Sequence, residues 1–225
     1  MNRRVILNIV LLFAFAVQGG AQTFNGGVTI VGLWGISPRW SVGAETSVRW
    51  EHNSNITAIV PRISAGALFK VVDNCRLFAA VQESQERYKG LSNFDNELRF
   101  FEGARFDGSR GLSQYLFFSQ RRISYYPLSQ SSFCSDVTYR AEYEKELQEG
   151  LWELSLFAGV TLNIHENVAG SNLLQRFAPG CEVARRMGRM MIGIVYECRL
   201  GSKRQIFLAD RHELHTIMLR LRRRH

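Results

Sequence analysis

The stretch WSVGAETSVRWE, residues 40–51, decides the fold of this chain. From Trp40 to Trp50 every second residue is apolar, aromatic or Thr, and the positions between them carry Ser, Gly, Glu and Arg. Successive side chains of a β-strand point to opposite sides, so this alternation predicts a strand with one apolar and one polar face. With the tilt that barrel strands adopt, the interval from Trp40 to Trp50 spans roughly 25 Å, which is the height of the apolar band of a membrane β-barrel.

The same alternation continues along the chain in segments of about 10 to 15 residues, with short polar or Gly-containing breaks and no helical period. We predict strands at 27–36, 39–51, 58–72, 75–88, 96–107, 113–126, 133–147, 151–164, 174–186, 189–200 and 211–224. Short connections favour an all-β, up-and-down antiparallel barrel. Single-chain bacterial barrels have an even number of strands, so we expect one segment to be split or missed and predict ten or twelve.

The first residues have the pattern of a secretory signal peptide. A basic start at Arg3 and Arg4 precedes an apolar run over 5–17, and small residues stand at Gly19 and Ala21. The run is shorter than the roughly 20 residues of a transmembrane helix, and the pattern predicts cleavage after Ala21. We therefore expect a signal peptide at 1–21, export, and an outer-membrane β-barrel domain at 22–225.

The polar faces of the expected strands carry charges of both signs. In a membrane barrel such faces line the lumen, where buried charges must be paired. The alternative is the solvated face of a soluble sandwich or lipocalin-like barrel. For the membrane barrel, the candidate lumen ion pairs are Glu45, Arg49, Glu97, Arg99, Arg140 and Glu142, and the candidate aromatic girdle is Trp34, Trp40, Trp50 and Trp152.

Five short motifs carry a resemblance to a known family. Gly32-Leu33-Trp34, Pro38-Arg39-Trp40-Ser41, Glu45 and Arg49 resemble the opening hairpin of a family of uncharacterised outer-membrane barrels common in the Bacteroidota, and Glu97-Leu98-Arg99-Phe100 resembles its mid-chain Glu-x-Arg-aromatic strand. The resemblance covers essentially the whole mature chain in its rhythm. It implies an outer-membrane β-barrel and brings no established activity.

The chain is basic, with a formal net charge of +8 and a pI near 9.7. Its basic clusters fall at expected strand ends and turns, at 121–122, 185–186, 203–204 and 220–224. We expect contact with anionic outer-membrane lipids and lipopolysaccharide rather than with nucleic acid. Barrel-assembly machinery is an expected partner during insertion, although the chain ends in Arg222-Arg223-Arg224-His225 and lacks the usual terminal aromatic residue of outer-membrane strands.

One motif suggests chemistry. His52-Asn53-Ser54-Asn55 resembles the His-x-Ser-Asn signature of outer-membrane lipid A deacylases, which implies His52 as a base for a Ser54 nucleophile. The alternative is a polar hairpin loop, because Asn and Ser are turn formers. Cys75, Cys134, Cys181 and Cys198 have no metal-site spacing, so we expect no metal and no cofactor.

Overall fold

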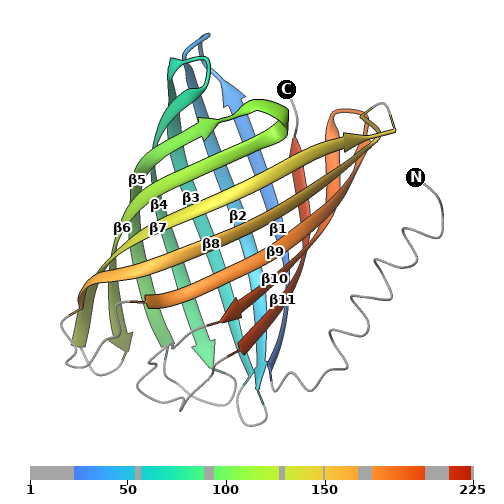
Figure 1. Ribbon diagram of the computed structural model, residues 1–225. Helices are drawn as coiled ribbons and strands as arrows, with labels where there is room; N and C mark the ends of the chain where they lie inside the picture. The colour runs from blue at the N-terminus through green and yellow to red at the C-terminus, as the bar shows by residue number, and fades with distance from the viewer. Residues whose placement is uncertain are drawn as a thin grey trace.

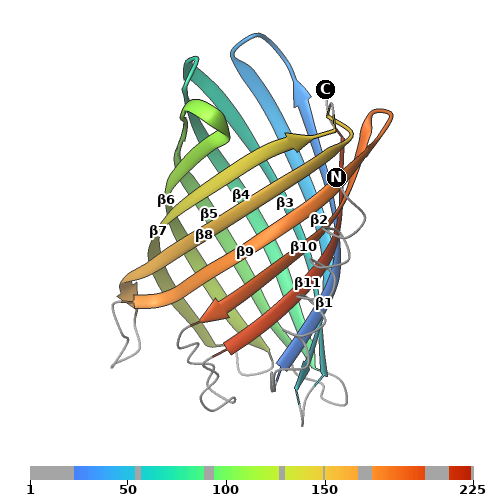
Figure 2. The same ribbon diagram turned by 45° about the vertical axis from the view of Figure 1, so that its right-hand side comes forward.

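The computed structural model describes residues 23–53, 57–88, 94–126, 130–148, 150–166, 174–200 and 213–223. These residues form one closed barrel, with a single 3-10 turn, η1 (Ser109–Gly111), between two of its strands (Figure 1, Figure 2). The strands are β1 (Thr23–Gly35), β2 (Trp40–Asn53), β3 (Thr57–Val72), β4 (Cys75–Tyr88), β5 (Phe94–Asp107), β6 (Leu112–Tyr126), β7 (Gln130–Leu147), β8 (Trp152–Glu166), β9 (Leu174–Met187), β10 (Met190–Leu200) and β11 (Glu213–Arg223). The all-β barrel expected from the alternation is confirmed.

The strand count corrects the sequence-based prediction. The barrel contains eleven strands rather than ten or twelve, and each segment identified from the alternation is one strand. Every strand pairs antiparallel with the next along the chain, whereas β1 pairs in parallel with β11. Strand directions alternate in an up-and-down barrel, so an odd number makes the first and last strands run the same way. The rule of even numbers, which outweighed the count from the pattern, was therefore wrong for this chain.

Because the number of strands is odd, the first strand starts at one end of the barrel and the last strand finishes at the other. The connections at 36–39, 73–74, 108–111 and 188–189 lie together at what we call the turn end, which is uppermost in Figure 1. β11 finishes at the turn end, whereas β1 starts at the opposite end. Residues 1–22, which include the expected signal peptide, lie outside the described residues.

The wall of the barrel has its apolar side outward and its polar side inward. On β2, Trp50 is 46% exposed whereas the neighbouring Arg49 is 5% exposed. The same division holds on the other strands: outward Ile30, Ile63, Phe100 and Ile194 are exposed, and inward Thr29, Ser119, Asn163 and Thr216 are buried. No helix in the described part of the chain is long and apolar enough to cross a membrane.

Among the described residues, the most deeply buried apolar side chains form one small cluster of Phe157, Val195 and Met218. A soluble barrel of this size would bury its large apolar side chains and expose its charges. This barrel has the reverse arrangement, and the interior is where its charged side chains meet.

Candidate functional site

The lumen contains three levels of side chains between the turn end and the opposite end. The register of each strand pair places them, once the stagger that a strand tilt of about 40° imposes is taken into account. A level of paired charges lies toward the turn end, an aromatic level overlaps it and extends to the middle, and a level rich in arginine lies toward the opposite end.

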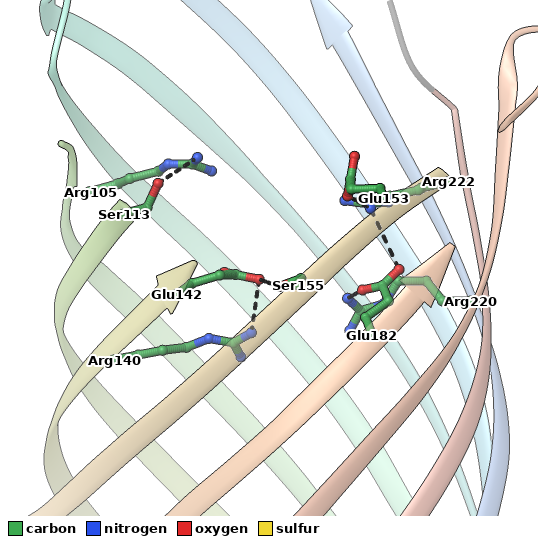
Figure 3. Close-up of polar contacts among 9 residues, drawn as sticks. All are labelled: Arg105, Ser113, Arg140, Glu142, Glu153, Ser155, Glu182, Arg220 and Arg222. Atoms are coloured by element: carbon green, nitrogen blue, oxygen red, sulfur yellow. Dashed lines mark hydrogen bonds and ion pairs between the residues drawn. The ribbon is translucent and has the colours of Figure 1, made fainter. Parts of the chain in front are cut away.

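The first level, which we call the paired layer, joins distant parts of the chain through ion pairs (Figure 3). Glu182 on β9 accepts from Arg220 on β11 at 2.7 Å and lies 3.6 Å from Arg222. Arg222 also donates to Glu153 on β8. Glu182 is 3% exposed, so two guanidinium groups share one buried carboxylate. This chain of contacts ties β8 and β9 to the closing strand.

The rest of the paired layer lies on β4 to β8. The Arg140 guanidinium is 3.4 Å from the Glu142 carboxylate, which also accepts a 2.7 Å hydrogen bond from the Ser155 hydroxyl (Figure 3). Asp107 accepts from Arg105 at 2.6 Å and lies 3.3 Å from Arg76. Glu144 is an electrostatic neighbour of Arg105 and Arg222. The layer therefore holds five arginines and five carboxylates: Arg76, Arg105, Arg140, Arg220, Arg222, Asp107, Glu142, Glu144, Glu153 and Glu182.

The middle level, the aromatic layer, forms on two arcs of the wall. On β4 to β6 the ring of Phe117 lies 6.0 Å from that of Phe78 and 6.1 Å from that of Phe101. On the other arc Phe157 contacts the apolar cluster, and the Arg140 guanidinium stacks 4.1 Å from its ring centroid. The ring of Phe157 lies over Gly180, where a Cβ atom would collide with it. Glycine at this position makes room for the aromatic layer.

The third level, the arginine belt, consists of Arg49 (β2), Arg62 (β3), Arg99 (β5), Arg121 (β6), Arg176 (β9) and Arg199 (β10). Arg99 is the direct cross-strand partner of Arg121. Arg49 is opposite Val60, two residues from Arg62, and the stagger between successive strands keeps the arginines at one level. The β9–β10 arc faces the β2–β6 arc, because Arg62 and Arg199 are electrostatic neighbours, as are Arg176 and Arg99.

Three carboxylates pair with members of the belt. Glu97 lies 2.7 Å from Arg99, and Asp136 lies 3.4 Å from Arg121. Glu197 accepts from Arg199 and is an electrostatic neighbour of Arg176 and Arg49. Glu45, nearer the middle of the lumen, is an electrostatic neighbour of Arg62. Arg99, Arg121 and Arg199 therefore have a carboxylate at ion-pair distance, whereas Arg62 and Arg176 have carboxylates only as more distant electrostatic neighbours.

The candidate pairs named from the sequence fall into different levels. Glu97 and Arg99 form an ion pair in the belt, and Arg140 and Glu142 form one in the paired layer. Glu45 and Arg49 both face the lumen of β2, but their electrostatic neighbours are on other strands: Arg62 for Glu45 and Glu197 for Arg49.

Sequence reasoning missed several lumen residues, and for different reasons. Arg62 lies on the same face of β3 as Ser64 and Gly66. Extending the alternation of β3 toward its start would therefore have identified Arg62 as a lumen residue. The direction in which Arg121 points is ambiguous in the sequence. Phe117-Phe118 and Arg121-Arg122 each put two like residues side by side, so neither apolar–polar alternation fits this strand if the lumen is wholly polar. In the structure Phe117 joins the inward aromatic layer and Arg121 lies inward, 11% exposed. For Glu182, Asp136 and Arg176, the neighbouring sequence does not indicate the residues that they contact, because those residues are on other strands.

The four candidate girdle tryptophans lie on the outer wall. Trp34 and Trp40 are exposed near the turn end, and Trp152 lies at the same end with the Arg185 guanidinium 5.6 Å from its ring. Trp50 is exposed toward the opposite end, above Gly26, where a Cβ atom would collide with the indole ring. The turn end therefore carries three of the four indoles.

The described part of the chain supports little other chemistry. Cys75, Cys134, Cys181 and Cys198 are free thiols. No group of three metal-ligating side chains occurs among the described residues. Of the deacylase-like motif, only the backbone of His52 and Asn53 is described, at the end of β2; their side chains and Ser54 lie outside the described residues.

The fold and lumen define a class: a closed β-barrel with an apolar outer wall and a charged, layered interior. Comparison of the chain with protein-family models, with curated proteins and with solved structures finds no match in any of the three. The resemblance to the Bacteroidota barrel family accordingly stays a prediction.

Proposed function

We propose that this protein is an outer-membrane β-barrel that serves as a structural component of the envelope, with a charge-paired lumen that passes only small solutes. One observation carries the proposal. Large apolar side chains are exposed around the outer wall, while arginines and carboxylates are buried inside. An outer wall of this kind is costly in water and is matched by a lipid bilayer.

The height of the wall supports the same conclusion. β2 runs from Trp40 to Asn53 and most of the other strands are of similar length, about twice the usual strand of a soluble protein. A tilted strand of this length spans the hydrocarbon layer of a bilayer. The exposed indoles of Trp40 and Trp50 mark two levels of the outer wall near its two edges, where aromatic side chains sit at membrane interfaces.

The size of the lumen favours a narrow passage. Eight strands give an interior that side chains just fill, whereas 16 to 18 strands leave an aqueous channel. Eleven strands lie between these sizes, and the paired and aromatic layers place long side chains across this interior. A passage in such a lumen has room for ions and small solutes only.

Two measurements test the proposal. After expression in a Gram-negative host, we expect the protein in the outer-membrane fraction and faster gel migration before boiling than after it. Recovery as a soluble periplasmic protein would disprove the membrane barrel. In planar bilayers we expect a unit conductance well below that of a 16-stranded porin, and a porin-sized conductance would rule out the narrow lumen.

A further inference from the structure

The arginine belt brings like charges close together in the lumen. Arg99 and Arg121 are direct cross-strand partners although they have the same charge, an arrangement that destabilises a sheet. The strongest electrostatic neighbours of Arg176 are mostly further arginines: Arg199, Arg99 and Arg121, together with the carboxylate Glu197. A structural role alone would favour equal numbers of opposite charges, as in the paired layer.

Arg62 and Arg176 differ from the ion-paired belt members Arg99, Arg121 and Arg199. Neither has a carboxylate within ion-pair distance among the described residues. The Nε–H of each is buried without a hydrogen-bond acceptor, a feature that they share with Arg99, Arg121, Arg140, Arg220 and Arg222. They lie on opposite arcs of the wall, on β3 and β9, and both are electrostatic neighbours of Arg99 and Arg199. Two guanidinium groups without an ion-pair partner among the described residues therefore share the same arginine neighbours in the lumen.

We propose that the arginine belt is a binding site for a small oxyanion of the phosphate or sulfate class, held between Arg62 and Arg176. Guanidinium groups bind tetrahedral oxyanions through paired N–H donors in a fixed planar geometry. A bound oxyanion would supply the missing negative charge and accept hydrogen bonds from groups that lack an acceptor. Rings of Arg or Lys in pores select anions and phosphate by the same electrostatics.

This inference rests on the proposed function for the access of solute to the lumen, and it names the solute class that the lumen would retain. A free phosphate ion and the phosphate of a lipid headgroup share the same chemistry. The belt lies inside the wall, so a headgroup would have to enter the lumen from one end of the barrel.

The decisive experiment titrates inorganic phosphate into the folded barrel in an uncharged detergent by calorimetry. Wild-type protein is expected to bind phosphate, and R62Q/R176Q is expected to bind about tenfold more weakly or not at all, because charged hydrogen bonds to the ion are lost. R39Q is the matched control, since it removes a positive charge from the exposed turn at 36–39 and should leave binding unchanged. R62K/R176K keeps the charge without the planar donors and should bind with intermediate affinity.

Absence of phosphate binding by folded wild-type protein, or unchanged binding by R62Q/R176Q, would overturn the site. Gel migration before boiling shows which variants fold. If R62Q/R176Q does not fold, weaker phosphate binding by R62K/R176K than by the wild type tests the site instead. Phosphatidic acid added to the micelles identifies the source: competition with phosphate indicates a lipid headgroup, and its absence indicates a free ion. A soluble, heat-insensitive protein would instead disprove the membrane barrel, so the two failures are distinguishable.

Discussion

The paired layer and the arginine belt are built from the same residue types on the same wall, yet they differ in how completely the charges are matched. In the paired layer five arginines face five carboxylates, and Glu182 holds two of those arginines. In the belt Arg99, Arg121 and Arg199 each pair with one carboxylate, whereas Arg62 and Arg176 have none within ion-pair distance among the described residues. The first arrangement closes the barrel, and the second leaves a site for a ligand.

The comparison teaches that buried charge has two uses in one lumen. Removing one partner of a buried pair is strongly destabilising, because the other charge is left without compensation. Removing one charge from a group of like charges relieves repulsion instead. The same chemical change, an ionised side chain replaced by its neutral amide or by glutamine, should therefore have opposite effects in the two levels.

The largest effect is expected at Glu182. Glu182→Gln leaves Arg220 and Arg222 short of a buried acceptor, so the free energy of unfolding should fall by about 3–5 kcal/mol. Urea unfolding of the barrel in micelles measures the change. A loss below about 1 kcal/mol would show that the paired layer does not hold the closing strand and would remove the distinction between the levels.

The boundary between the two levels is tested at Gly180. A Cβ atom there would collide with the ring of Phe157 and with the Tyr196 carbonyl oxygen, so Gly180→Ala should destabilise the barrel by about 1–3 kcal/mol. Thermal unfolding measures this. Gly35→Ala is the matched control, because no atom lies within 4 Å of its Cβ position. Equal stability of the two variants would show that the aromatic layer is loosely packed.

The belt should respond in the opposite sense to the paired layer. In phosphate-free buffer, Arg176→Gln removes a guanidinium surrounded by others, so the free energy of unfolding should stay constant or rise by up to about 1 kcal/mol. Urea unfolding beside Glu182→Gln makes the comparison direct. If Arg176→Gln destabilised the barrel as strongly as Glu182→Gln, the belt would be a structural network like the paired layer.

The smallest effect is expected outside the lumen, at the turn between β3 and β4. A hydrogen bond from Lys70, with its charge, lowers the pKa of the Asp73 carboxyl below its ordinary value. The stabilisation that a lowered carboxyl pKa provides is present above the unfolded pKa and is lost as the pH falls through the folded one. Because Asp73 is fully exposed, Asp73→Asn should change the free energy of unfolding at acidic pH only slightly. Urea titrations at several acidic pH values measure this change.

Much of the fold followed from the alternation of residues. The pattern around Trp40 and Trp50 identified the strand, its two faces and which face lies outward. The predicted strand count was wrong because the even number of strands in other barrels was applied to this chain. Nothing in the local sequence indicates that β1 and β11 pair in parallel. The lumen was harder, because which arginine meets which carboxylate depends on register and tilt around the whole barrel. Arg222 and Glu153 are 69 positions apart in the chain, and neither residue's surroundings indicate the other.

The pairing of β1 with β11 also limits how this chain can be rewired. Joining the two ends of an even-stranded barrel needs only a short linker, so its strands can be circularly permuted at any loop. Here β1 starts at one rim and β11 finishes at the other, so such a linker would have to run the full height of the wall. Duplication or loss of a hairpin changes the strand number by two and preserves this seam. Only the gain or loss of a single strand would remove it.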